Sequence, residues 1–356
     1  MKILQVIPYF CFGGAETMCE NLTYALTDLG NEVTVVSLYD EHTPISGRLE
    51  DAGVKLLYLD KKLGMDVSMV PKLTKIMKAE RPDVVHTHLD VIKYAVAAAK
   101  LAGVKKCVHT VHNVADKEAE GAIQKVINRT YFKLGWCTPV ALSPKVRISI
   151  ADFYGMEIGK IPMIFNGVDL SKCQPKEDYR TGETITLLHI GRFNEQKNHA
   201  GLLQAFQMLL ACYPNCRLHL LGDGELLEQT RADAEKMGLS NRVRFLGSQS
   251  NVYPYLREAD IFLLPSLYEG MPMTIIEAMG TGLPIVASNV GGIPDMLTDR
   301  ENGLLVPCDP YAVCGACAEL IDDQALRETL GKNAKEESQR FSARYMAEQY
   351  CFLYEL

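Results

Sequence analysis

One stretch decides how this chain folds: Leu263-Leu264-Pro265-Ser266-Leu267-Tyr268-Glu269-Gly270-Met271-Pro272-Met273-Thr274-Ile275-Ile276-Glu277-Ala278-Met279. The stretch begins with the last residues of an apolar run that starts at Ile261. Proline and glycine then interrupt it, and a helix-forming segment follows. This order predicts a strand, a loop and a helix. Pro272 suits the first helical turn, where its missing N–H would have had no partner in any case.

The predicted start of this helix has the chemistry of an anion site. Gly270 permits a close backbone approach to a ligand. The amides from Met273 and Thr274 onward should point into the loop, where the helix dipole favours negative charge. Glu269 and Glu277 flank this point, which suits a ligand with phosphates in its middle and hydroxyls at either end, as in a nucleotide sugar. The alternative is an ordinary strand–loop–helix unit with two glutamates placed by chance.

Composition limits the class of protein. A chain of 356 residues that is 47% hydrophobic can form two domains. No apolar run approaches the roughly 18–20 residues of a transmembrane helix. The net charge of −7 argues against a nucleic-acid binder. Residues 1–168 carry 20 Lys and Arg against 18 Asp and Glu, whereas residues 169–356 carry 17 against 26, so the halves have charges of +2 and −9.

The pattern of cysteines indicates the cellular compartment of the protein. The eleven cysteines have no regular spacing, which favours reduced thiols in the cytoplasm over a disulfide scaffold. The first eight residues have the pattern of a buried strand and not of a signal peptide. Cys314 and Cys317 form a CxxC pair without a second pair, which makes a zinc or redox site a weak hypothesis.

The N-terminal half begins with a βαβ pattern. Residues 2–8 predict a strand, a helix follows up to Leu29, and residues 33–38 predict a second strand. Gly13 and Gly14 lie between the first strand and the helix, at the strand end where open α/β sheets bind ligands. These glycines would let the backbone approach a phosphate or a sugar; the alternative is a tight turn.

Four histidines come at the ends of two later strands, and they are His86, His88, His109 and His112. The further strands of this half are predicted at about 54–58, 83–86, 105–110, 138–142 and 161–165. Because strand residues alternate in direction, Thr110 and His112 should face one side of the sheet and His109 and Val111 the other. No carboxylate or cysteine lies at ligand spacing, so a zinc site is disfavoured.

Residues 117–136 predict an amphipathic helix. Lys125, Arg129 and Lys133 repeat at i, i+4 and i+8, with aromatic residues including Trp136 at its end. A basic stripe beside aromatics can lie on an anionic membrane surface. An ordinary solvated helix face is the alternative.

The C-terminal half repeats the α/β pattern after a polar linker of about fifteen residues that follows Asp169. Strands are predicted at 184–190, 217–221, 242–246, 260–264 and 283–287, which indicates a second doubly wound sheet. Arg192 and Lys197 fall in the loop after the first of these strands, where two cations could hold a diphosphate. Gly222-x-Gly224 is a weak dinucleotide signal because the third glycine is missing.

Several of these pieces occur together in the order expected of one family. They are Gly13-Gly14-Ala15-Glu16, His112, Asn166-Gly167-Val168-Asp169, Gly191-Arg192-Phe193 with Lys197, Gly222-Asp223-Gly224, Pro265-Ser266 through Glu269-Gly270-Met271-Pro272 to Glu277, and Gly291-Gly292-Ile293. Over nearly its whole length the chain resembles the retaining glycosyltransferases of family 4. The resemblance implies the GT-B fold, with two Rossmann-like doubly wound domains facing each other across a cleft. It places an acceptor-binding domain at 1–168, a donor-binding domain at 169–340, and a last helix, about 341–356, that crosses back to the first domain.

The resemblance also implies roles for matching positions. Glu277 would bind the ribose hydroxyls, and Glu269 with the backbone from Gly270 through Met271 to Met273 would hold the donor sugar and phosphate. Thr274 and Gly222 would also belong to the donor site. Arg192 and Lys197 would neutralise the leaving diphosphate. Gly13 and Gly14 would lie under the diphosphate and sugar, and His112 would contact the sugar near its anomeric carbon.

The resulting hypothesis is a retaining, metal-independent glycosyltransferase. It would move a sugar from a UDP- or GDP-type donor to a glycan or lipid-linked acceptor in cell-surface polysaccharide synthesis, in the cytoplasm or at the inner face of the plasma membrane. Positive charge at the leaving diphosphate stabilises the transition state, and Arg192 and Lys197 would supply what a metal supplies elsewhere. The alternatives are a sugar-nucleotide-binding protein, an epimerase or phosphorylase on the same architecture, and an NAD-dependent oxidoreductase, whose Gly-x-Gly-x-x-Gly motif is absent after the first strand.

Overall fold

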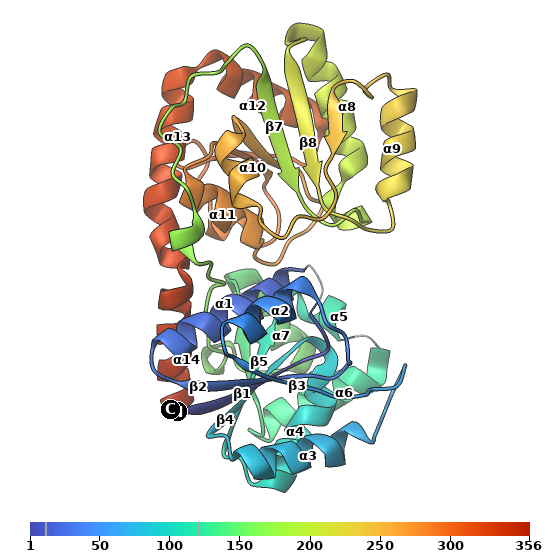
Figure 1. Ribbon diagram of the computed structural model, residues 1–356, viewed down its shortest axis with the longest axis vertical. Coiled ribbons are helices and arrows are strands. Elements are labelled where there is room, and N and C mark those ends of the chain that lie inside the picture. Colours follow the sequence, from blue (N-terminus) through green and yellow to red (C-terminus); the bar gives the residue numbers. More distant parts are fainter. Residues whose placement is uncertain (11–12, 120) are drawn as a thin grey trace. The chain divides into compact units, whose positions relative to one another are not determined.

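The computed structural model describes residues 1–10, 13–119 and 121–356 and divides the chain into two compact units (Figure 1). The N-terminal unit comprises Met1–Gly167 together with Ala343–Leu356. The C-terminal unit comprises Val168–Ser342. Cys11 and Phe12, next to the predicted glycine turn, and Glu120, within the predicted helix 117–136, lie outside the described residues.

The N-terminal unit is built on a parallel sheet of six strands in the order β3-β2-β1-β4-β5-β6. Its strands are β1 (Lys2–Ile7), β2 (Glu32–Ser37), β3 (Lys55–Tyr58), β4 (Val84–His88), β5 (Lys106–Val111) and β6 (Thr138–Ala141). Its helices are α1 (Gly14–Asp28), α2 (Pro44–Asp51), α3 (Met69–Glu80), α4 (Ile92–Ala102), α5 (Ala115–Glu118), α6 (Gly121–Lys133), α7 (Pro144–Tyr154) and α14 (Ala343–Glu355).

The C-terminal unit has a second parallel sheet of six strands, in the order β12-β11-β10-β7-β8-β9. Its strands are β7 (Ile185–Ile190), β8 (Cys216–Leu221), β9 (Val243–Phe245), β10 (Ile261–Leu264), β11 (Ile285–Ser288) and β12 (Leu304–Val306). Its helices are α8 (His199–Cys212), α9 (Leu227–Lys236), α10 (Tyr253–Glu258), α11 (Met273–Thr281), α12 (Pro310–Asp322) and α13 (Gln324–Glu337).

Both sheets have the strand order of a Rossmann fold. Within each unit the first and fourth strands of the chain are neighbours, so the order reverses between β1 and β4 and between β7 and β10. Ligands of open α/β sheets bind outside the carboxyl ends of the strands at such a switch point. A ligand is therefore expected at the loops that follow these four strands.

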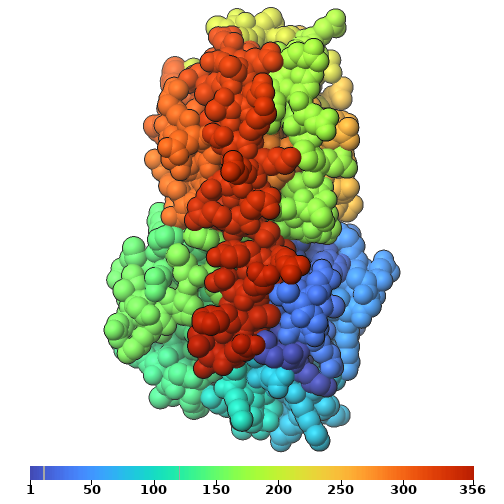
Figure 2. Space-filling model, turned by 90° about the vertical axis from the view of Figure 1, so that its left-hand side faces the viewer, coloured from blue at the N-terminus to red at the C-terminus, as the bar shows by residue number. Residues whose placement is uncertain are grey.

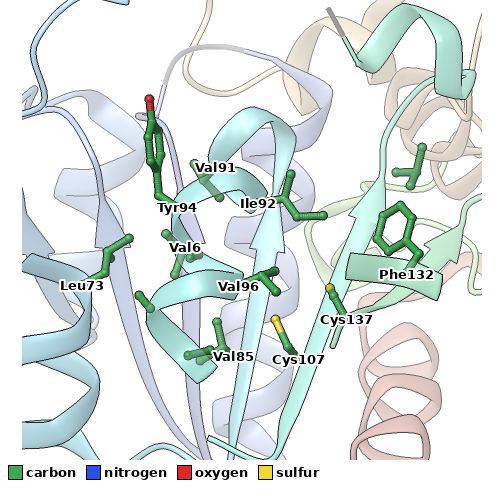
Figure 3. Packing of buried hydrophobic residues seen from close by; sticks show 14 of the residues in the cluster. Val6, Leu73, Val85, Val91, Ile92, Tyr94, Val96, Cys107, Phe132 and Cys137 are labelled. Carbon is green, nitrogen blue, oxygen red and sulfur yellow. The ribbon is translucent and has the colours of Figure 1, made fainter. Parts of the chain in front are cut away.

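One buried cluster of the N-terminal unit forms where apolar strands meet helices that include α4 and α6. Figure 3 shows Val6 and Val85, from the central strands, packed near Val96 of α4, with Phe132 of α6 farther along the same cluster. Strands buried on both faces carry near-continuous apolar runs, as in β1, where Ile3 through Ile7 are all buried. This packing fixes the backbone from which the strand-end side chains project.

Helix α14 belongs to the N-terminal unit although it is the last element of the chain. It packs against α1, and Figure 2 shows it in dark red beside blue residues from the start of the chain. Its buried tyrosines reach the sheet: Tyr350 OH lies 2.6 Å from Thr110 Oγ1, and Tyr354 OH lies 2.7 Å from His86 Nδ1. The predicted final helix, about 341–356, is therefore present.

Two predictions about local structure are wrong. Residues 161–165 form only an isolated bridge from Met163 to Ala141, next to Pro162, which has no N–H to donate to a ladder. The single helix predicted at 117–136 is replaced by α5 and α6, because Ala119 leaves helical geometry and Gly121 has φ +84°. No helix in the described part of the chain is long and apolar enough to span a membrane.

The C-terminal unit also differs from the prediction at its two ends. The polar segment after Asp169, expected to be a linker, is held along the C-terminal unit: Lys176 Nζ donates to Ala259 O at 2.7 Å, and Tyr179 OH donates to Gly282 O at 2.9 Å. Strand β12 was not predicted, because its three residues are too short for a periodic signal.

Candidate active site

The stretch 263–279 folds as predicted, into β10, a loop and α11. Pro272 has extended geometry and Met273 is the first helical residue, so the first-turn amides of α11 open toward the loop. Gly270 and Met271 lie in the loop and are buried. The strand–loop–helix prediction is confirmed, and it places Glu269 and Glu277 on either side of the start of the helix.

Glu269 and Lys197 come together at the switch point between β7 and β10. Lys197 Nζ lies 2.6 Å from Glu269 Oε1, and the two side chains are only 15% and 5% exposed. Ser266 Oγ donates to the same oxygen at 2.7 Å, and Gln196 Nε2 donates to Glu269 Oε2 at 3.1 Å. The predicted phosphate-binding cation and the predicted sugar-binding carboxylate are thus paired with each other, and sequence reasoning had assigned no role to Gln196 or Ser266.

Arg192 is held much more loosely. It follows β7 directly, and its Nε lies 3.5 Å from Glu225 Oε2, with both side chains more than half exposed. Exposed pairs of this kind contribute little free energy. Arg192 can therefore turn toward an anion at low cost, which fits its predicted role.

Glu277 is a buried carboxylate whose side chain makes no hydrogen bond to any of the described residues. It is 7% exposed, and burial raises its pKa to about 8, with Lys172 acting in the opposite direction. Thr274 Oγ1, one turn earlier on α11, is likewise buried and makes no hydrogen bond within the described ranges. Buried polar atoms of this kind normally find partners, so α11 presents an acceptor and a hydroxyl group that a ligand could satisfy.

Gly222 has a structural reason for being glycine. Its φ is +137°, and a Cβ at this position would lie 2.0 Å from Gly191 O. The end of β8 thus packs directly on the backbone that leads to Arg192. Gly291, with φ +60°, packs in the same way on Glu269, since its Cβ would lie 1.8 Å from Glu269 O. These glycines shape the two loops that carry the candidate site.

In the N-terminal unit, Gly13 precedes α1 and Gly14 is its first residue. Glu16 folds back over Gly13, because a Cβ on Gly13 would lie 2.4 Å from Glu16 Oε2. A carboxylate is favoured at this end of a helix, where an incoming anion would also bind. The structure therefore adds Glu16 to the residues around the glycine turn, a position to which the sequence analysis gave no role.

His112 lies directly after β5 and is joined to the neighbouring strand. Its Nε2 lies 3.1 Å from His88 Nδ1 at the end of β4, and its backbone N–H donates to Glu118 Oε2 at 2.5 Å. The predicted alternation is confirmed: Thr110 and His112 bond to His86 and His88, whereas His109 bonds to Thr87 on the other face. Burial lowers the pKa of His112 to about 4, so the ring is neutral at pH 7.

Among the described residues, the histidines of this sheet edge belong to no metal-binding group. Within residues 1–10, 13–119 and 121–356, no group of three or more His, Cys, Asp or Glu side chains is arranged to hold a metal ion. The histidine nitrogens instead bond to one another and to threonine, tyrosine, glutamine and glutamate side chains.

Comparisons with known proteins agree with this geometry. The model of "Glycosyl transferases group 1" matches residues 174–337, and that of "Glycosyltransferase Family 4" matches residues 12–172. A UDP-Gal:alpha-D-GlcNAc-diphosphoundecaprenol alpha-1,3-galactosyltransferase from Escherichia coli is 30% identical over 319 residues, 83% of this chain and 81% of that protein. The lipopolysaccharide core biosynthesis glycosyltransferase LpsD of Rhizobium meliloti is 33% identical over 49% of this chain and 50% of its own length.

Among solved structures, HepE of Anabaena in complex with UDP and glucose superimposes with a TM-score of 0.87 over 100% of both chains, at 20% identity. This similarity shows that the fold is that of a GT-B glycosyltransferase. Together with the family models and the relative from Escherichia coli, it identifies the chain as a glycosyltransferase of group 1, family 4.

Proposed function

We propose that this protein is a retaining glycosyltransferase that moves a sugar from a nucleoside-diphosphate sugar of the UDP or GDP type to a glycan or lipid-linked acceptor in cell-surface polysaccharide synthesis. UDP is favoured because HepE was crystallised with UDP and the Escherichia coli relative is named for a UDP-galactose donor. That relative is also named for a diphosphoundecaprenol-linked acceptor, which supports a lipid-linked acceptor here.

The observation that carries the proposal is Glu277. A buried carboxylate whose side chain has no hydrogen-bond partner among the described residues, four residues into a helix whose amides open toward a loop, can accept hydrogen bonds from a ribose diol while the helix start faces the diphosphate. Thr274 Oγ1 offers a further group for the phosphate oxygens. The backbone of Gly270 and Met271 lines the same loop.

Catalysis would consist mainly of stabilising the departing diphosphate. Arg192 and Lys197 would face the negative charge that grows as the anomeric bond breaks. Preorganised positive charge of this kind is usually the largest single contribution to lowering the activation barrier. For Lys197 this requires the diphosphate to share the cation with Glu269, which lies 2.6 Å away. We propose that these two side chains make a metal unnecessary. Glu269 and His112 are proposed to position the sugar.

We propose that the protein acts at a lipid surface, on the cytoplasmic side of the membrane. The outward face of α6 carries Ile123 and Val126, which are 67% and 62% exposed, beside exposed Arg129 and Lys133. A helix with apolar and basic residues side by side suits the interface of an anionic bilayer. Lys125 is less available than expected, because its Nζ lies 4.0 Å from the centre of the Phe153 ring.

A transfer assay tests the proposal. The protein is incubated in EDTA with a panel of nucleoside-diphosphate sugars and a polyprenyl-diphosphate acceptor, and the anomeric configuration of the product is read by NMR. The expected product keeps the configuration of the donor and forms without a divalent cation. Binding of a nucleotide sugar without transfer to any acceptor, or an inverted product, would contradict the proposal.

A further inference from the structure

A directional chain of hydrogen bonds runs through the N-terminal unit to His112. It begins at Cys19 O in α1, to which Thr23 Oγ1 donates at 2.7 Å. Gln5 Nε2 donates to Thr23 Oγ1 at 2.7 Å, His88 Nε2 lies 2.9 Å from Gln5 Oε1, and His112 Nε2 lies 3.1 Å from His88 Nδ1. Gln5, Thr23 and His88 are buried, so water does not compete for these bonds.

The proton positions follow from the first bond. A hydroxyl has one proton, and that of Thr23 goes to a backbone carbonyl, which can only accept. Thr23 Oγ1 must therefore accept from Gln5, which fixes the NH₂ end of the Gln5 amide toward Thr23. The carbonyl end, Gln5 Oε1, then faces His88 and can only accept.

The protonated nitrogen of each of the two histidines follows in the same way. His88 Nε2 must carry the proton that Gln5 Oε1 accepts, so in a neutral ring His88 Nδ1 is the acceptor. His112 Nε2 must then carry the proton donated to His88. Burial lowers the pKa of both rings, that of His112 to about 4. The His109 ring acts in the same direction on both, and the His86 ring does so on His88. Among the acidic side chains of the described residues, Glu118 raises the pKa of His112.

We propose that Gln5 and His88 are positioning residues that hold His112 in its Nε2–H tautomer and so present His112 Nδ1 as a hydrogen-bond acceptor to a hydroxyl group of the donor sugar. The sugar as ligand rests on the proposed function. Nδ1 makes no hydrogen bond to any residue in the described part of the chain, and His112 is only partly buried, unlike His88. The backbone bond from His112 to Glu118 holds the main chain from which the ring projects.

The variant Gln5→Met tests this inference. It keeps a side chain of similar length but removes the acceptor for His88 Nε2–H, so His88 can take either tautomer and His112 is no longer held in one. Gln124→Met is the matched control: Gln124 is buried in α6 of the same unit, and its Nε2 donates one hydrogen bond, to Asn128 Oδ1 at 2.6 Å. Long-range ¹H–¹⁵N NMR of histidine-labelled protein reads which ring nitrogen carries the proton, and His112→Gln assigns the signals.

In the wild type we expect Nε2–H for both His88 and His112, in Gln5→Met a mixture or the Nδ1–H form of His112, and in Gln124→Met no change. Sugar transfer by Gln5→Met should fall roughly tenfold in kcat, the worth of one hydrogen bond, with UDP affinity unchanged. An Nδ1–H His112 in the wild type, an unchanged tautomer in Gln5→Met, or equal loss of transfer in both variants would overturn the inference. A wild type with Nε2–H His112 that binds no nucleotide sugar would instead contradict the proposed function.

Discussion

Lys197 Nζ lies 2.6 Å from Glu269 Oε1, in a pair that is almost completely buried. The two residues come from the loops after β7 and β10, so the pair bridges the switch point of the C-terminal sheet. Ser266 and Gln196 donate two further hydrogen bonds to the carboxylate, which keeps it in place when the lysine is drawn to another anion. The pair therefore links the candidate phosphate-binding cation to the candidate sugar-binding carboxylate.

This pairing predicts different effects on nucleotide binding for two neutralising substitutions. Lys197→Met removes a cation from the diphosphate site, and loss of a charge-assisted hydrogen bond should weaken UDP binding about 10- to 100-fold. Glu269→Gln releases Lys197 from its carboxylate, so UDP binding should be unchanged or tighter while sugar transfer is lost. Calorimetric titration with UDP distinguishes the two, and equal weakening by both variants would show that the pair acts only as a structural brace.

Glu277 predicts a pH dependence of UDP binding. Ribose hydroxyls donate to the ionised carboxylate and so lower its pKa from the value of about 8 in the free protein. Below that pH, binding must release a proton, and UDP affinity should fall as the pH drops from 8 toward the pKa of the complex. Titration in buffers of different ionisation enthalpy measures the released proton. Glu277→Gln should bind UDP more weakly and without proton release; release that persists in this variant would assign it to another group.

Gly222→Ala separates a structural role from a donor-binding role. At φ +137° with a Cβ only 2.0 Å from Gly191 O, alanine should lower the free energy of unfolding by about 3 kcal/mol. Gly315→Ala is the control, because Gly315 lies inside α12 and a Cβ there would meet none of the described atoms outside the helix within 4 Å, so it should stabilise by roughly 1 kcal/mol. Thermal unfolding reads both changes. A Gly222→Ala protein with wild-type stability and no UDP binding would assign this glycine to the donor site.

The outward face of α6 predicts salt-sensitive binding to anionic vesicles. Arg129→Glu with Lys133→Glu should weaken binding roughly fivefold for each basic charge lost, and Ile123→Ser with Val126→Ser should weaken it even at low salt. Co-sedimentation with vesicles of anionic or zwitterionic phospholipid measures this. Charge reversal at Lys236 and Lys332 in the C-terminal unit is the control. If both sets of charge reversals weaken vesicle binding equally, the α6 face is an ordinary solvated surface.

Much of the fold could be predicted because the strands are buried on both faces. β10 is a continuous apolar run, β7 is mostly apolar, and Pro272 marks the start of α11, so local chemistry and tertiary structure agree there. The sequence pattern gave a wrong prediction where a single residue determines the local backbone structure. Gly121 divides a segment that looked like one helix, and Pro162 limits residues 161–165 to a single bridge, although both segments have the right apolar residues.

The candidate site was predictable in its residues but not in its contacts. Strand-end positions marked Lys197, Glu269 and His112, but no spacing rule pairs Lys197 with Glu269 across 72 positions of sequence. Nor could the sequence show that Gln5 orients His88 from another strand, 83 positions away, because parallel neighbours are set by topology. Glu16 was part of a quoted motif but received no role, because the sequence does not display that its side chain reaches back over Gly13.

The central claim, that α11 and the loops of the C-terminal unit bind a nucleoside diphosphate without a metal, is tested most directly by thermal unfolding in EDTA. UDP, GDP, ADP and NADH are compared on the wild type and on Glu277→Ala. At a hundredfold excess over its Kd, a ligand stabilises the folded state by about 2.7 kcal/mol. We expect one nucleoside diphosphate, UDP first, to raise the Tm of the wild type and not that of Glu277→Ala. A rise with NADH alone, or an equal rise in the variant, would contradict the account.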